Sequence, residues 1–198
     1  MSQFIESIQL LDGQFKRLQL HQARMEKAMA EYYPKTEIIT LENVLMQQTY
    51  PKVGLFKCRV VYDSEIRLIE FIPYTPPIIR SLKIVEINIP SLPYKIVDRK
   101  DYQTAFSKRA ECDDVLIVKN GLLTDTSYCN IALWDGERWF TPKTPLIQGV
   151  NRAQLLEEKK LIEKDIKVDD LVNFKRIVLF NALNEFGTIQ MDVSSISI

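Results

Sequence analysis

The hydrophobic period of the chain changes near Leu20, and this change constrains the fold more than any other feature of the sequence. Residues 3–11 alternate apolar and polar side chains, a pattern that predicts a half-buried strand. Asp12-Gly13 is a strong signal for a two-residue hairpin turn, so the chain should return antiparallel. From Leu20 the apolar spacing predicts a helix that ends before Pro34. A strand hairpin followed by a helix indicates a mixed α/β (α+β) fold.

The rest of the chain continues this mixture. A second helix is predicted over 36–48, and β-rich runs cover 53–62, 66–74 and 78–89. The later elements are a helix over 101–112, strands over 115–119 and 121–124, a hairpin of 131–134 with 139–141, a helix over 151–163 and a strand over 176–181. The two prolines of Pro90-Ser91-Leu92-Pro93 predict a stiff connector, which divides the chain into lobes 1–89 and 90–198.

Composition excludes several classes of protein. The 198 residues carry 26 basic and 26 acidic side chains, so no basic surplus points to a nucleic-acid or membrane partner. No apolar run reaches membrane-spanning length, and the first residues lack the pattern of a signal peptide. The three cysteines lack paired metal-ligand spacing, and there is a single histidine. We expect a cytoplasmic protein with reduced thiols and no metal site.

A series of short motifs follows in a fixed order. None is specific alone, because matches this short have high false-positive rates. The motifs are Tyr94-Lys95-Ile96-Val97-Asp98-Arg99, Leu123-Thr124-Asp125-Thr126-Ser127, Asn130, Thr141-Pro142 and Pro145-Leu146-Ile147-Gln148-Gly149-Val150-Asn151-Arg152. Together they resemble the class IV aminotransferase family. These are pyridoxal-phosphate (PLP) enzymes of fold type IV, which include branched-chain and D-amino-acid aminotransferases and aminodeoxychorismate lyase.

The resemblance implies a small N-terminal α/β lobe, a β-rich and barrel-like C-terminal lobe, and PLP in the cleft between them. It makes Lys95 the catalytic lysine, which holds the cofactor as a Schiff base and then moves the Cα proton. Such an amine must be partly desolvated beside a carbonyl cofactor. The alternative interpretation of Lys95 is an exposed loop lysine.

Asp125 stands where the family usually has a glutamate that keeps the pyridine nitrogen protonated. The aspartate is one methylene shorter, so the ring must sit closer or a water must bridge. The alternative is a turn or helix-capping aspartate, because Asp125-Thr126-Ser127 has good turn chemistry. Asn130 and Thr141-Pro142 are predicted to hold the loop and hairpin that present Asp125.

The phosphate requires fixed donors, and the resemblance supplies three groups of them. Gly149, Val150 and Asn151 open a helix whose N–H groups can face an anion, although the family has threonine where Asn151 stands. Asn181-Ala182 matches a second phosphate element, or else is a simple strand-end turn. Arg24 of His21-x-x-Arg24 matches an arginine that forks onto the phosphate. We predict a structural role for His21.

The substrate is less constrained than the cofactor. Arg59 lies on a predicted strand and matches a family position that can carry an arginine for the substrate carboxylate, although a solvent-exposed charge explains it equally well. Glu6 and Ser7 on the first strand are weaker substrate candidates. The family begins with a further segment that helps to form the substrate pocket, whereas this chain resembles compact members.

These observations predict a PLP-dependent aminotransferase that acts on a small amino acid and a 2-oxo acid. Two alternatives stay open. The first is an aminodeoxychorismate lyase that releases 4-aminobenzoate and pyruvate, and the second is a PLP-binding protein without turnover. The resemblance also implies a homodimer.

Overall fold

A computed structural model describes residues 3–197 as two structural units. The first unit comprises Met1–Pro76 and Pro93–Asp98, and the second comprises Pro77–Leu92 and Arg99–Ile198. The division differs from the predicted boundary at Pro90 because strand pairing, rather than the prolines, decides membership. Lys95, predicted to belong to the C-terminal lobe, lies in the first unit because its segment pairs with a strand there.

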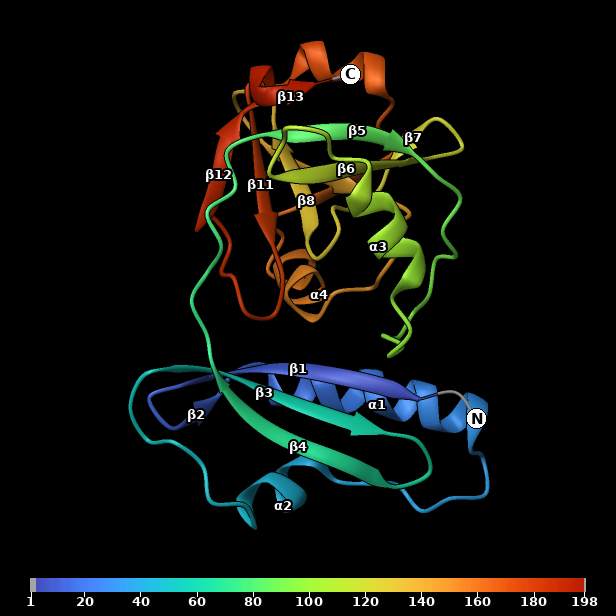
Figure 1. Ribbon diagram of the computed structural model, residues 1–198, viewed down its shortest axis with the longest axis vertical. Coiled ribbons are helices and arrows are strands. Elements are labelled where there is room, and N and C mark those ends of the chain that lie inside the picture. Colours follow the sequence, from blue (N-terminus) through green and yellow to red (C-terminus); the bar gives the residue numbers. More distant parts are fainter. Residues whose placement is uncertain (1–2, 198) are drawn as a thin grey trace. The chain divides into compact units, whose positions relative to one another are not determined.

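The first unit is an antiparallel sheet in the order β2-β1-β3-β4, with α1 running along one of its faces (Figure 1). Its elements are β1 (Phe4–Leu11), β2 (Gln14–Phe15), α1 (Leu18–Tyr32), α2 (Leu41–Met46), β3 (Leu55–Tyr62) and β4 (Ile66–Pro73). The helix predicted over 36–48 is therefore shorter than expected.

The turn at Asp12-Gly13 confirms the predicted hairpin. Asp12 has φ 48° and Gly13 has φ 79°, and positive φ at both central residues matches the twist of the flanking strands. The alternation of β1 then places Phe4, Ile8 and Leu10 in the core of the first unit, where all three are fully buried.

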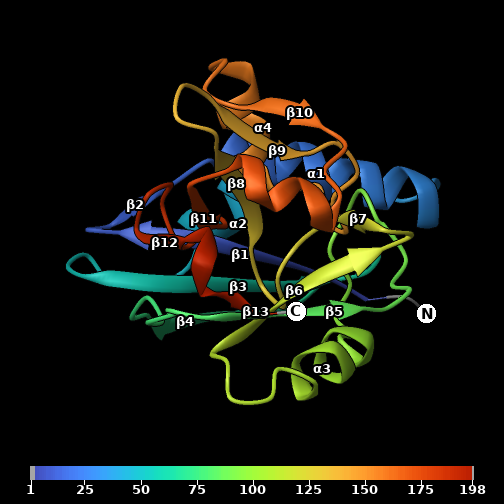
Figure 2. The same ribbon diagram turned by 90° about the horizontal axis from the view of Figure 1, so that it is seen from above.

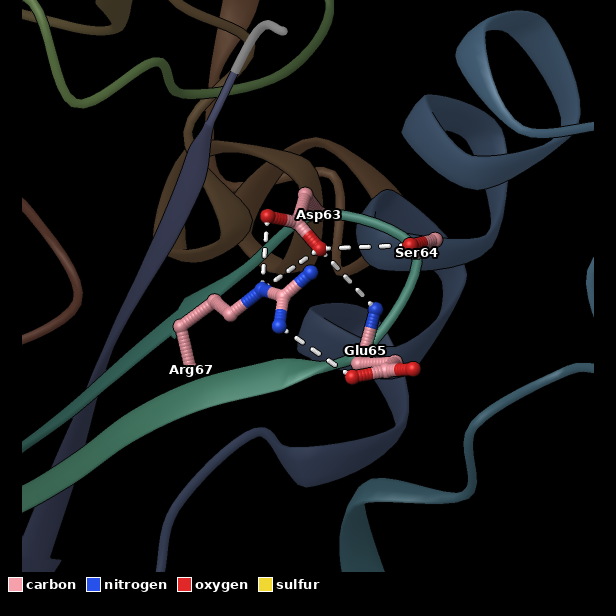
Figure 3. A network of polar contacts seen from close by, with 4 residues as sticks. All are labelled: Asp63, Ser64, Glu65 and Arg67. Atoms are coloured by element: carbon pink, nitrogen blue, oxygen red, sulfur yellow. Dashed lines mark hydrogen bonds and ion pairs between the residues drawn. The ribbon is translucent and has the colours of Figure 1, made fainter.

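The hairpin between β3 and β4 is closed by the turn cluster Asp63, Ser64, Glu65 and Arg67 (Figure 3). The Asp63 carboxylate accepts hydrogen bonds from Arg67 Nε at 2.8–2.9 Å and from the Glu65 N–H at 3.2 Å. Ser64 Oγ donates to the same carboxylate at 3.3 Å. The cluster fixes the register between β3 and β4.

The second unit contains two sheets, in the orders β10-β9-β8-β11-β12 and β13-β5-β6-β7. Figure 2 shows α3 beside β5 and β6, and α4 beside β8 and β9. The elements are β5 (Leu82–Glu86), α3 (Lys100–Ser107), β6 (Asp114–Lys119), β7 (Leu122–Leu123), β8 (Asn130–Trp134), β9 (Trp139–Pro142), α4 (Val150–Glu157), β10 (Ile162–Lys164), β11 (Arg176–Phe180), β12 (Ile189–Asp192) and β13 (Ile196–Ser197), with short 3-10 helices at Val168–Asn173 and Val193–Ser195.

A shared apolar core joins these two sheets. Leu82 and Leu116 from one sheet pack in the same cluster as Leu133, Ile177 and Leu179 from the other, and all five are fully buried. Two curved sheets around one core form the β-rich second lobe expected from the resemblance. Among residues 3–197, no helix is both long and apolar enough to cross a membrane.

Candidate active site

Lys95 lies on a short segment that extends the sheet of the first unit beyond β1. The Ile5 N–H donates to the Lys95 carbonyl at 2.9 Å, and the Val97 N–H donates to the Gln3 carbonyl at 3.0 Å. Phe4 and Ile96 form an antiparallel bridge between these hydrogen bonds. The backbone on either side of Lys95 is therefore held by strand pairing.

The residue before Lys95 strengthens this anchor. Tyr94 is 2% exposed and packs edge-on against Phe4 and Tyr32, with ring centroids 5.1 and 5.4 Å away. Its hydroxyl donates to Glu31 Oε1 at 3.0 Å and lies 2.7 Å from the Tyr32 hydroxyl. Lys95 itself is half-buried, and its Nζ donates to Ser7 Oγ at 3.2 Å.

Glu6, Arg24 and His21 form a buried triad between β1 and α1. Arg24 forks onto Glu6, with Nε 2.9 Å from Oε1 and Nη2 2.5 Å from Oε2, and His21 Nδ1 lies 2.5 Å from Oε2. Burial alone would raise the pKa of Glu6, but the Arg24 charge and the His21 hydrogen bond hold it at about 2. Burial lowers the pKa of His21. The structural role predicted for His21 stays a prediction.

Arg24 was predicted to contact the phosphate, and that contact stays a prediction. A guanidinium has five N–H donors, and Glu6 accepts from two of them in a planar, bidentate arrangement. The sequence contains a signal for this pairing that the prediction did not use. Glu6 is in phase with the apolar residues of its strand, and a buried carboxylate requires a cationic partner.

Replacing Glu6 with alanine should destabilise the protein strongly, because Arg24 would remain buried without its counter-charge. Breaking a buried pair in this way costs roughly 3–5 kcal/mol. The contribution is present above the usual glutamate pKa and is lost as pH falls towards about 2. Urea unfolding at pH 7 measures the loss. The control is Glu65→Ala, an exposed turn carboxylate worth less than about 1 kcal/mol, and equal effects of the two changes would contradict the account.

Arg59 lies on β3 directly opposite Ser7, and its Nη1 donates to Glu70 Oε2 of β4 at 2.7 Å. Its side chain is 27% exposed. Ser7, Arg59 and Glu70 therefore form one polar row across three strands, on the sheet face opposite Glu6. The structure shows that Glu70 orients Arg59, and the substrate role of Arg59 stays a prediction.

In the second unit, Asp125 is held in a buried socket. Its Oδ1 accepts from Asn130 Nδ2 at 2.9 Å, and its Oδ2 accepts from the Leu146 and Ile147 N–H groups at 2.8 and 3.0 Å. Burial raises the pKa of Asp125 to about 6 despite these hydrogen bonds. The predicted role of Asn130 in holding Asp125 is confirmed. A carboxylate has about four acceptor positions, so one remains for a further donor.

Gly149 is required by the same socket. A Cβ at this position would lie 1.9 Å from Asn130 Oδ1, far inside contact distance, although the Gly149 backbone (φ −70°) suits any residue. Asn130 Nδ2 also donates to the Ile147 carbonyl at 3.0 Å. Any side chain at Gly149 therefore displaces the amide that holds Asp125.

On the expectation from the resemblance that this site holds PLP, Gly149→Ala should weaken PLP binding at least about tenfold, because it removes a hydrogen bond to the charged carboxylate. Equilibrium dialysis of PLP measures the change. In the background of Asn130→Ala the same substitution should have little further effect, since the clash is absent. Full additivity of the two substitutions would show that Gly149 acts in some other way.

The predicted phosphate elements are brought together in the second unit. Asn151 is 1% exposed, and its Nδ2 donates to the Asn181 carbonyl at 2.8 Å. Asn181 Oδ1 accepts from the N–H groups of Leu183 and Asn184, which closes a tight turn. The Asn151 amide therefore joins the start of α4 to the 181–184 turn.

Three backbone donors remain at this junction. Within residues 3–197, the N–H groups of Val150, Asn151 and Ala182 have no hydrogen-bond acceptor. The first N–H groups of a helix lack intrahelical partners and carry its positive dipole end. Gly149, at the N-cap of α4, adds no side chain to the approach. The donor set suits a phosphate group.

Arg99 belongs to the predicted lysine motif, and the structure shows it to be an electrostatic neighbour of Asp125. Its Nη2 donates to the Ser127 carbonyl at 2.7 Å, and its guanidinium lies 3.6 Å from the centre of the Tyr102 ring. Burial lowers the pKa of Arg99, while Tyr102 and Asp125 favour its charged form. The spacing Lys95-x-x-x-Arg99 alone does not predict that Arg99 stacks on an aromatic ring near a buried carboxylate.

Comparison with known proteins defines the class. The sequence matches the model of the amino-transferase class IV family over residues 3–190. The chain therefore belongs to the class IV aminotransferase family.

Individual relatives are similar to the chain over most of its length. The chain is 34% identical over 186 residues to an uncharacterized protein of Haemophilus influenzae, which covers 93% of this chain and 99% of the relative. A structure from Haemophilus somnus, provisionally described as a 4-amino-4-deoxychorismate lyase, has 31% identity and a TM-score of 0.87 over 93% of this chain and 98% of its own. A PLP-bound aminotransferase of Brucella abortus shares the fold, with 14% identity and a TM-score of 0.72 over 96% of this chain and 80% of its own.

Proposed function

We propose that this protein is a PLP-dependent aminotransferase that acts on a small amino acid and a 2-oxo acid. The observation that carries the proposal is the Asp125 socket. A buried carboxylate with a pKa near 6 and, among residues 3–197, no ion-pair partner is suited to a cationic ring nitrogen. The donors at Val150, Asn151 and Ala182 suit the phosphate of the same cofactor.

Each residue has a distinct task in this proposal. The Lys95 amine attaches the cofactor covalently and, once released, takes the Cα proton of the substrate and returns it. Asp125 holds the proton on the ring nitrogen by its negative charge. Arg24 contributes to phosphate binding, and Arg59 to binding of the substrate carboxylate. When bound, PLP supplies an electron sink for the pair released at Cα.

A second candidate function is favoured by the Haemophilus somnus structure, whose description names lyase chemistry. An aminodeoxychorismate lyase would use Lys95 and the phosphate donors in the same way, but a bond in the substrate side chain would break. The fold itself does not decide between these outcomes.

One experiment separates the two reactions. The purified protein, supplied with PLP, is incubated either with amino acids and 2-oxoglutarate or with aminodeoxychorismate. Glutamate formed in stoichiometric amount with a new 2-oxo acid supports the aminotransferase. Pyruvate and 4-aminobenzoate without amino transfer support the lyase, whereas cofactor binding without either product would identify a PLP-binding protein without turnover.

A further inference from the structure

Ser7 is a side chain of the first unit that faces Lys95. The strand segment at Lys95 pairs with β1 so that Phe4 lies opposite Ile96, which places Lys95 opposite Ile5. Residues two apart on a strand share a face, so Ser7 lies on the same side of the sheet as Lys95. Its hydroxyl accepts a hydrogen bond from Lys95 Nζ at 3.2 Å, and the residue is only 8% exposed.

The buried triad behind the sheet fixes this placement. A slip of one residue would exchange the two faces of β1 and bring Glu6, rather than Ser7, towards Lys95. The slip is prevented because Glu6 is bound by Arg24 and His21 on the opposite face. The triad therefore acts on the lysine indirectly, by holding the register that presents a neutral hydroxyl to its amine.

A hydroxyl suits a lysine that must react. It can accept a hydrogen bond from the ammonium form and donate one to the neutral amine, so it serves both protonation states. A carboxylate in the same place would favour the ammonium form and withhold the lone pair. Arg59, directly opposite Ser7 on β3, is a cation that is bound to the Glu70 carboxylate.

We propose that Ser7 is a positioning residue for Lys95, which holds the free amine in place for attack on the carbonyl of the cofactor. The inference rests on the proposed function, since it concerns the step in which Lys95 captures PLP. It replaces the weaker substrate role that the sequence allowed for Ser7. The Ser7 hydroxyl itself forms no bond to the cofactor.

The test measures how fast protein freed of cofactor captures PLP, followed by the visible absorption of the lysine-bound cofactor. Ser7→Ala should capture PLP about tenfold more slowly, whereas Ser7→Thr, which keeps the hydroxyl, should stay within about twofold of wild type. Ser64→Ala is the matched control, because it removes a hydroxyl from the turn cluster of the same unit. Its capture rate should not change.

The outcomes separate this inference from the proposed function. If wild type captures PLP on Lys95 and Ser7→Ala does so at the same rate, the positioning role is overturned and the proposed function stands. If Ser7→Thr is as slow as Ser7→Ala, the hydroxyl is not the active group, which also overturns the inference. If wild type forms no lysine-bound cofactor, both fall.

Discussion

Replacing Lys95 with alanine is expected to abolish amino transfer and covalent attachment of PLP together. The same amine performs both tasks in the proposed function, and loss of a positioned acid–base group alone lowers rates by about 10²–10⁴-fold. We therefore expect a fall of about 10³-fold or more in kcat, measured as product formation under saturating PLP.

Two controls sharpen this prediction. Lys100→Ala removes an exposed lysine at the start of α3 and should leave the rate near that of wild type. Small primary amines added to Lys95→Ala should restore part of the rate, because they can carry the proton that the side chain no longer carries. Activity of Lys95→Ala close to that of wild type would eliminate Lys95 as the catalytic lysine.

Replacing Asp125 with asparagine is expected to have the second-largest effect. The substitution removes the negative charge that favours a protonated ring nitrogen, so turnover should fall at least about 100-fold, as for loss of a preorganised electrostatic contact. The lysine-bound cofactor should still form, because Lys95 is unchanged. Thus Asp125→Asn separates turnover from attachment, which Lys95→Ala does not.

The wild-type and Asp125→Asn proteins should also differ in how cofactor affinity depends on pH. Burial raises the pKa of Asp125 to about 6, although its hydrogen bonds and the charge of Arg152 oppose the rise. Below that pH the carboxyl is protonated, so cofactor affinity should fall by about tenfold per pH unit relative to Asp125→Asn, whose side chain does not titrate. The ionisations of PLP affect both proteins equally, so they do not contribute to the difference in affinity. If cofactor affinity has the same pH dependence in both proteins, Asp125 does not face a cation in the complex.

Local chemistry made the hairpins of this fold predictable. Both residues of Asp12-Gly13 have positive φ, as their turn type requires, and this turn was identified from two residues. The end of α4 was not predictable in this way. The charged run after Glu157 continues a helical pattern, but Ile162–Lys164 instead pairs in parallel with β9 as β10. That pairing joins residues 22 positions apart, such as Ile162 and Phe140, which no local window contains.

In the candidate site too, local motifs were predictable from the sequence and contacts between distant residues were not. Motif order was enough to select Lys95, Asp125 and the start of α4, because the family pattern is carried by short segments. The partners of these residues lie far away in the sequence. Glu6 meets Arg24 across 18 positions, and Ser7 meets Lys95 across 88. Such contacts follow from strand register and helix packing, so they became visible only in the folded chain.

The central claim is that Lys95 carries PLP, and reduction of the complex with borohydride tests it most directly. Reduction makes the bond between lysine and cofactor permanent, and peptide mass spectrometry then locates it. The account predicts a phosphopyridoxyl group on the peptide that contains Lys95, and its absence from the Lys95→Ala protein. A label on another lysine, or no label on protein saturated with PLP, would contradict it.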